Sequence, residues 1–136
     1  MRLDLYQAEA ARVASEQQAL LDQARAILAQ GRPLSGLEQG GVLHALQVLV
    51  ENSIGKSKQL LKARGQNVPV SGYDAFSALA DLGLIQPQDL SSWNAVVGLR
   101  NRIVHDYMNI DMAQVLSLVV ANQPQFIVDF LSKRFD

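Results

Sequence analysis

The chain of 136 residues contains no cysteine. Disulfide cross-links, thiol nucleophiles and thiolate metal sites are therefore excluded. Histidine is also scarce, because only His44 and His105 occur and they stand far apart in the sequence. A metal site needs several such ligands close together, so the sequence predicts no metal site and no bound cofactor.

Neither sign of charge dominates, since 12 Lys and Arg stand against 13 Asp and Glu for a net charge of -1. This balance argues against a protein that coats nucleic acid through its bulk charge, but it does not exclude a small local site for one phosphate. No apolar run approaches the roughly 18 residues needed to cross a bilayer. The polar opening MRLDLYQAEAARV lacks the apolar stretch of a signal peptide. We expect a cytoplasmic protein that does not bind membranes.

Hydrophobic residues make up 49% of the chain, which is enough for one core in a single domain spanning residues 1–136. Apolar residues recur at helical spacing, and no stretch alternates with period two. Helices are predicted over residues 3–30, from about 35 to 65, over 74–82, from Pro87 onward, and from about 109–111 to 131. Pro124 should bend or interrupt the last helix. The expected fold class is all-α, a bundle of four main helices and one short helix.

The second predicted helix carries most of the local signals. Ser35 with Glu38 three residues later matches a capping box at its start. Near its end lies a basic run of Lys56, Lys58, Lys62 and Arg64. We interpret this basic run as cations placed favourably near a helix C-terminus. The alternative interpretation is that these side chains contact an RNA backbone.

Several single polar and aromatic residues outside these segments are interpreted as structural or solvent-facing. Glu51 and Asn52 are polar residues between apolar ones. We interpret both as part of a solvated helix face, and the alternative is that they face a cleft. His44 is interpreted as a packed or surface side chain. Trp93 is interpreted as a residue of the core or of a dimer interface.

Four chemically active side chains gather in the stretch GLRNRIVHDYMNID, residues 98–111. Arg100, Asn101, His105 and Tyr107 fall within eight residues there. One predicted stripe of a helix face, spaced 4, 3, 4 and 3, consists of Trp93, Val97, Arg100, Val104 and Tyr107. Burying an unpaired guanidinium is very costly, so Arg100 must meet a cleft, a partner charge or an interface.

Arg100 and His105 do not share a face of a regular helix. At about 100° per residue they lie roughly 140° apart. They converge on one ligand only if the helix ends or kinks between them, or if long side chains reach round the helix. A two-fold dimer also helps, because it brings two copies of the stripe together.

The residue types indicate a reaction. Imidazole gives or takes a proton near neutral pH, and a guanidinium offers a planar fork to a phosphate. Asn101 can orient the imidazole or a ligand. These groups suit metal-free cleavage of RNA, in which the substrate's own 2′-hydroxyl attacks phosphorus. From spacing alone, an Arg and a His five residues apart on a helix are more often structural, and that interpretation stays open.

The pattern R-N-x-x-x-H-x-Y from Arg100 to Tyr107 resembles the motif of the HEPN superfamily and, with its tyrosine, that of the HepT-like toxins. Three flanking segments are also similar to that family: LVENSIGKSKQLL at 49–61, YDAFSALADLGLI at 73–85 and NID at 109–111. The resemblance therefore covers about residues 35 to 131.

This resemblance implies a HEPN-type four-helix up-and-down bundle that forms a homodimer, with both motifs lining one cleft. It implies a metal-independent endoribonuclease toxin of a type II toxin–antitoxin pair. Arg100 and His105 would be the catalytic pair, and Asn101 a supporting residue. The antitoxin would be an MntA-type minimal nucleotidyltransferase that transfers AMP from ATP to Tyr107. The added negative charge would repel RNA and occupy the arginine.

Two other accounts remain. In the first, the chain is a non-catalytic helical domain that binds a nucleotide or a nucleotidyltransferase, with Arg100 and His105 as phosphate contacts. In the second, it is a structural dimer in which Arg100 pairs with a carboxylate across the interface. Only the toxin account requires His105 for turnover.

Overall fold

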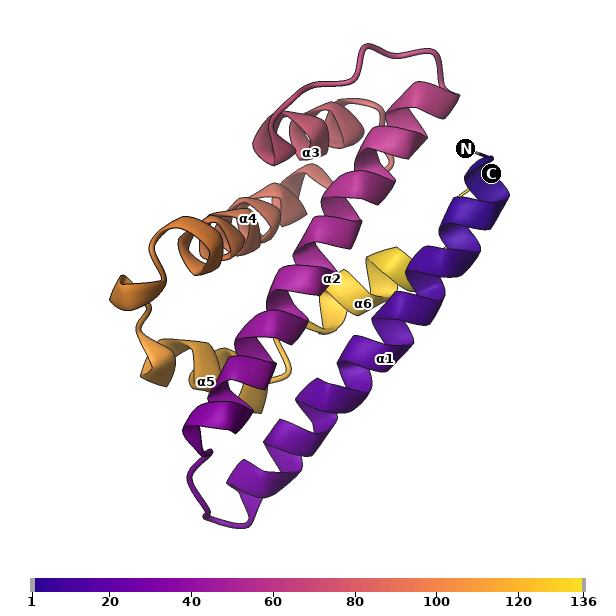
Figure 1. Cartoon of the computed structure of the whole chain (residues 1–136). Coiled ribbons are helices and arrows are strands. Elements are labelled where there is room, and N and C mark those ends of the chain that lie inside the picture. The colour runs from indigo at the N-terminus through magenta and orange to yellow at the C-terminus, as the bar shows by residue number, and fades with distance from the viewer. Residues whose placement is uncertain (1, 136) are drawn as a thin grey trace.

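The computed structural model describes residues 2–135, and in this part of the chain helices are the only regular elements (Figure 1). They are α1 (Leu3–Ala29), α2 (Gly36–Ala63), α3 (Gly72–Asp81), η1 (Pro87–Asp89), α4 (Leu90–His105), η2 (Tyr107–Asn109), α5 (Met112–Val120) and α6 (Gln125–Ser132). The elements η1 and η2 are single turns of 3-10 helix. The predicted all-α fold is confirmed.

The two longest helices, α1 and α2, run antiparallel side by side, and α2 lies between α1 and the pair α3 and α4 (Figure 1). Helix α6 packs against both of them, whereas α3 and α4 pack on α2 and on each other. Helix α5 contacts α1. Helix α2 therefore touches most of the other helices, and its side chains can reach the motif on α4.

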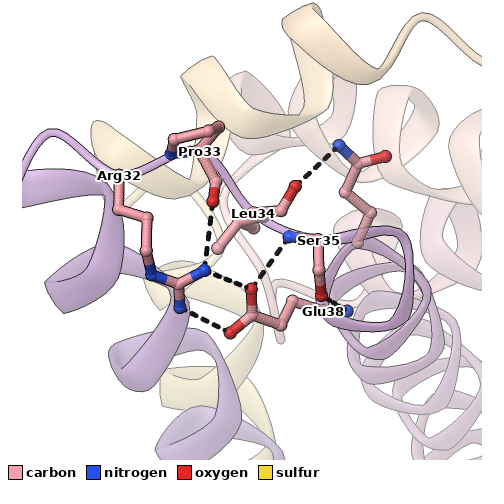
Figure 2. A network of polar contacts seen from close by, with 6 residues as sticks. Arg32, Pro33, Leu34, Ser35 and Glu38 are labelled. Atoms are coloured by element: carbon pink, nitrogen blue, oxygen red, sulfur yellow. Dashed lines mark hydrogen bonds and ion pairs between the residues drawn. The ribbon is translucent and has the colours of Figure 1, made fainter.

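A polar network fixes the turn between α1 and α2 (Figure 2). The Glu38 backbone N–H donates to Ser35 Oγ at 3.1 Å, and the Ser35 N–H donates to Glu38 Oε1 at 2.8 Å. The predicted capping box is thereby confirmed. The Arg32 guanidinium also donates two hydrogen bonds to the Glu38 carboxylate, and with the Ser35 N–H it lowers the pKa of Glu38 to about 2.

The predicted last helix is two helices, because the chain bends by 62° between α5 and α6. Asn122 adopts a left-handed conformation at φ 56°, and Pro124 immediately precedes α6. Arg25 of α1 donates to the Val119 carbonyl at 3.0 Å and to Asn122 Oδ1 at 2.6 Å, which ties this turn to α1. The interruption expected at Pro124 is confirmed. Within residues 2–135 no single helix is long and apolar enough to cross a membrane, and only the bent α5–α6 pair meets that standard, by length and composition alone.

An aromatic cluster forms one part of the core. Phe76 stacks on Trp93 with ring centroids 4.3 Å apart, and Phe130 meets both rings edge-on. Trp93 is 3% exposed. Trp93 was interpreted as a residue of the core or of a dimer interface, and the structure shows it in the core of the chain.

Lys56 lies inside the protein rather than on the surface of α2. It is fully buried and donates hydrogen bonds to the carbonyls of Phe130, Leu131 and Lys133. These carbonyls lie at the C-terminal end of α6, where a helix lacks its own donors. The interpretation of Lys56 as a cation at the end of its own helix was wrong, because its side chain caps a different helix. Burial, together with Lys133, lowers the pKa of Lys56 to about 8.

Candidate active site

The motif occupies the last turns of α4 and the residues that follow it. Helix α4 ends at His105, and Asp106 leaves the helical conformation at φ -145° and ψ 44°. Tyr107 therefore lies in η2 and not on the helix. The prediction of one helical stripe that includes both Arg100 and Tyr107 was wrong, because the helix stops before it reaches the tyrosine.

Arg100 is the best-anchored residue of the motif. Its NH2 group donates to Glu51 Oε2 at 2.8 Å, and its NH1 group donates to Asn101 Oδ1 at 3.1 Å. The side chain is only 25% exposed, and its buried Nε has no hydrogen-bond partner among the described residues. Of the three surroundings predicted for this guanidinium, two are observed within the chain: a partner charge and a cleft.

That partner charge comes from α2. Glu51 is half-buried, and its second oxygen accepts a hydrogen bond from Gln47 Nε2 at 3.2 Å. Asn52 donates to the Val48 carbonyl of its own helix at 2.8 Å. The favoured interpretation of Glu51 as part of a solvated face was wrong, because α2 packs on α4 and turns this carboxylate toward Arg100. The carboxylate that pairs with Arg100 thus belongs to the same chain and need not be supplied across an interface.

His105 and Tyr107 lie at the exposed end of the motif. Both side chains are exposed, Tyr107 by 56%, and the neighbouring Met108 by 91%. Among residues 2–135, no hydrogen bond or ion pair joins either of them to Arg100. The structure therefore brings together Arg100, Asn101 and Glu51, and it leaves His105 and Tyr107 exposed without bringing them into contact with that group.

The turn that presents these residues is built by local polar contacts. Asn109 Nδ2 donates to Asp106 Oδ1 at 2.6 Å, and the Gln114 N–H donates to Asp111 Oδ1 at 3.2 Å to cap α5. Asp and Asn side chains that bind nearby backbone or side-chain groups compete with helix formation. Such contacts end one helix and begin the next within six residues, without glycine or proline.

A groove of about 230 Å³ runs along α4 beside Arg100. Its walls are largely apolar, with Leu99 and Ile103 from α4 and Leu118 from α5, and Arg102 also lines it. A guanidinium at the edge of an apolar groove can bind a phosphate oxygen in surroundings that exclude much of the water. Among residues 2–135, no group of three or more His, Asp or Glu side chains could hold a metal ion.

The all-α bundle carries the motif R-N-x-x-x-H-x-Y at the end of α4. This combination of fold and motif agrees with the HepT-like class that the sequence motif indicated. The model of the family described as Ribonuclease HepT-like matches residues 17–131. This chain therefore belongs to the HepT-like ribonuclease family. No curated protein matches the chain by sequence.

Solved structures show the same fold in toxin–antitoxin complexes. A tri-AMPylated HEPN toxin of Shewanella oneidensis in complex with its MNT antitoxin is 22% identical, with a TM-score of 0.79 over 93% of this chain and 96% of that chain. A toxin–antitoxin complex with AMP-PNP is 21% identical, with a TM-score of 0.78 over 93% and 97%. A mutant MntA–HpeT toxin–antitoxin complex is 22% identical, with a TM-score of 0.77 over 93% and 96%. The fold is thus of the HEPN type.

Proposed function

We propose that this protein is a toxin that cleaves RNA without a metal ion. Its antitoxin would be a nucleotidyltransferase, which neutralises the toxin by AMPylation of Tyr107. The whole length of the toxin chain would act as one domain, in the cytoplasm. The observation that carries the proposal is Arg100, a guanidinium that Glu51 holds at the edge of a groove, with His105 and Tyr107 exposed at the end of the same motif. Membership of a ribonuclease family supports the same reaction.

The proposed reaction is an internal phosphoryl transfer. The 2′-oxygen of the RNA attacks the adjacent phosphorus and the bond to the 5′-oxygen breaks, which leaves a 2′,3′-cyclic phosphate and a 5′-hydroxyl. His105 transfers a proton to or from these oxygens, and Arg100 stabilises the charge on the non-bridging oxygens. Asn101 supports the arginine through their hydrogen bond.

We propose that the active form is a homodimer. Arg100 and His105 point in directions roughly 140° apart on a regular helix, so one chain does not aim both at one phosphate. A two-fold axis beside α4 lets two copies of the motif line a shared cleft. Val104 and Met108, which are exposed at the end of the motif, supply apolar surface for such an interface.

The proposed neutralisation modifies an accessible phenol. The Tyr107 oxygen attacks the α-phosphorus of ATP, the bond between the α- and β-phosphates breaks, and pyrophosphate leaves with the electron pair. The phenol proton passes to a base of the transferase. The AMP phosphate carries a negative charge that competes with RNA for Arg100. The complexes of the structurally similar toxins with MNT antitoxins support this partner.

The test compares unmodified parent protein, of confirmed intact mass, with Arg100→Ala and His105→Ala in RNA cleavage assays containing EDTA. We expect the parent to cut RNA with 2′,3′-cyclic phosphate ends, and each substitution to reduce cleavage by about 100-fold or more while the helical circular dichroism spectrum is retained. Equal behaviour of all three proteins would favour the non-catalytic partner domain instead.

A further inference from the structure

A larger cavity lies at the opposite end of α4 from His105. Its volume is about 620 Å³, it is open to solvent, and it is lined by the α3–α4 connection, the first turns of α4, the α5–α6 turn and α6. Pockets that hold small ligands or parts of ligands typically measure about 300–1,000 Å³. None of the motif residues lines this cavity.

Aromatic rings form part of its wall. Trp93 and Phe130 are almost completely buried, whereas Phe126 is only half-buried and packs edge-on against Trp93 at 4.9 Å. Phe126 therefore retains ring surface that a flat ligand can cover.

Three exposed polar residues line the cavity beside these rings. They are Gln86, Ser92 and Gln123, and their side chains make no hydrogen bonds within residues 2–135. Trp93, which is almost completely buried, contributes ring surface to the same wall. The amides and the hydroxyl together offer donors and acceptors to a ligand.

The cavity adjoins the groove beside Arg100. Ser92, Gln123 and Phe126 line both. Ser92 precedes Arg100 by eight residues of α4, which corresponds to about 12 Å along the helix axis. A strand that places a phosphate at Arg100 can thus extend along α4 to the cavity.

We propose that this cavity binds an unpaired nucleobase of the RNA strand whose phosphate lies at Arg100. The proposal rests on the ribonuclease function proposed above. A nucleobase is flat and carries both donors and acceptors on its edge, which matches the Phe126 ring and the free amides of Gln86 and Gln123. The cavity holds one anion and one cation, Asp89 and Lys133, so its charges favour a neutral base over a phosphate.

This assignment accounts for RNA recognition by a chain with a net charge of -1. Proteins bind single strands by combining backbone contacts with stacking of bases on aromatic side chains. Here Arg100 supplies the charge and the cavity supplies the base contact, so a strongly basic surface is not required.

Binding can be measured without cleavage, because Trp93 is the single tryptophan and lies in the cavity wall. The His105→Ala protein in EDTA is titrated with hexaribonucleotides of A, C, G or U, with an abasic ribose-phosphate hexamer, and with the nucleoside monophosphates. Phe126→Leu and Gln123→Ala are made in the same background. Asn94→Ala is the matched control, since Asn94 is an exposed amide of α4 outside both cavities.

We expect at least one base-containing hexamer to change Trp93 fluorescence saturably and to bind about tenfold or more tightly than the abasic hexamer. Phe126→Leu and Gln123→Ala should each weaken that binding severalfold, and Asn94→Ala should leave it unchanged. If Phe126→Leu does not fold, Gln123→Ala alone decides the point.

Equal binding of the base-containing and abasic hexamers would overturn the proposal, as would parental affinity in both cavity variants. Monophosphates that bind as tightly as the hexamers would assign the cavity to a free nucleotide and overturn its role for an RNA strand. The titration does not depend on turnover. Failure of the parent to cleave RNA would therefore count against the ribonuclease function and not against base binding.

Discussion

Arg100 lies on α4 with two guanidinium nitrogens already engaged, one by the Glu51 carboxylate and one by the Asn101 amide oxygen. These contacts fix the direction of the planar fork before any phosphate arrives. Such preorganisation is worth much in catalysis, because small displacements of a reacting group cost large factors in rate. Glu51 is on this account a positioning residue that acts through Arg100.

Glu51→Ala should lower kcat by about 10- to 100-fold with little change in KM, because the guanidinium loses its fixed orientation. Steady-state cleavage of RNA measures both constants. In the Arg100→Ala background the same substitution should cause no further loss, since the residue it positions is absent. Asn52→Ala is the matched control, because Asn52 bonds only to its own helix. Additive losses in the double variant would contradict the positioning role.

Lys56 is a second residue whose surroundings decide its properties. Its ammonium group caps α6 and lies 5.2 Å and 4.9 Å from the ring centroids of Phe130 and Phe135. Burial lowers its pKa from 10.5 to about 8. Between these two values the unfolded chain binds one more proton than the folded protein, so the contribution of Lys56 to stability rises with pH.

The unfolding free energy of the parent should therefore increase from pH 8 to pH 10.5 relative to Lys56→Met. The pKa shift sets an upper limit of about 3 kcal/mol on this difference. Urea denaturation of both proteins across the range measures it, and the comparison cancels groups common to both. Curves that stay parallel over the range would show that Lys56 keeps its ordinary protonation in the folded protein.

The residues differ in how far the sequence could predict them. The motif residues could be named from their types and order, because four reactive side chains in eight residues stand out in an apolar stretch. The Arg100–Glu51 pair joins positions 49 residues apart and depends on which faces of α2 and α4 meet. Lys56 carried a usable signal, since it falls three residues after buried Ser53 and four before buried Leu60, on the core side of α2.

At the scale of elements, helix ends marked by strong local chemistry were predicted and the others were not. The capping box at Ser35 and the interruption at Pro124 follow from local bonding and from the missing proline N–H. The end of α4 at His105 has neither glycine nor proline. It depends on the local contacts of Asp106 and Asn109, which a helical pattern of apolar residues does not reveal.

Helices α1 and α2 approach each other closely at Gly55, and a substitution there tests this packing. A Cβ at this position would lie 2.2 Å from the Tyr6 hydroxyl and 3.4 Å from its ring carbon Cζ. Gly55→Ala should therefore destabilise the parent by about 1–2 kcal/mol through overpacking. In a Tyr6→Phe background the hydroxyl is absent, and the same change should stabilise by up to about 1 kcal/mol because alanine favours helix.

Urea unfolding of the parent, Gly55→Ala, Tyr6→Phe and the double variant gives the effect of the alanine in each background. The critical result is that the two effects on the unfolding free energy have opposite signs. Destabilisation of equal size in the two backgrounds would mean that the close approach at Tyr6 does not limit the spacing of α1 and α2.

At the scale of the whole molecule, the single chain leaves apolar surface beside its motif. Val104, Tyr107 and Met108 are exposed at the end of the motif. The proposed homodimer covers this surface and brings two motifs into one cleft.

Met108→Asp should convert the dimer to a monomer, because a charge in an apolar interface loses its hydration without a partner. Sedimentation equilibrium measures the mass, and circular dichroism checks that the helices remain. Leu37→Asp is the control, since Leu37 is 89% exposed at the start of α2, away from the groove. A parent that is monomeric at all concentrations would contradict the shared cleft.

The central claim is that Arg100 and His105 cleave RNA by activating its own 2′-hydroxyl. The most direct measurement is single-turnover cleavage in EDTA by parent protein of confirmed unmodified mass. Its substrates are an RNA and the same strand with 2′-deoxyribose at each mapped cleavage position. The account predicts that the RNA is cut to 2′,3′-cyclic phosphate ends and that the substituted positions resist cleavage. Equal cleavage of both strands, or cleavage of neither, would contradict it.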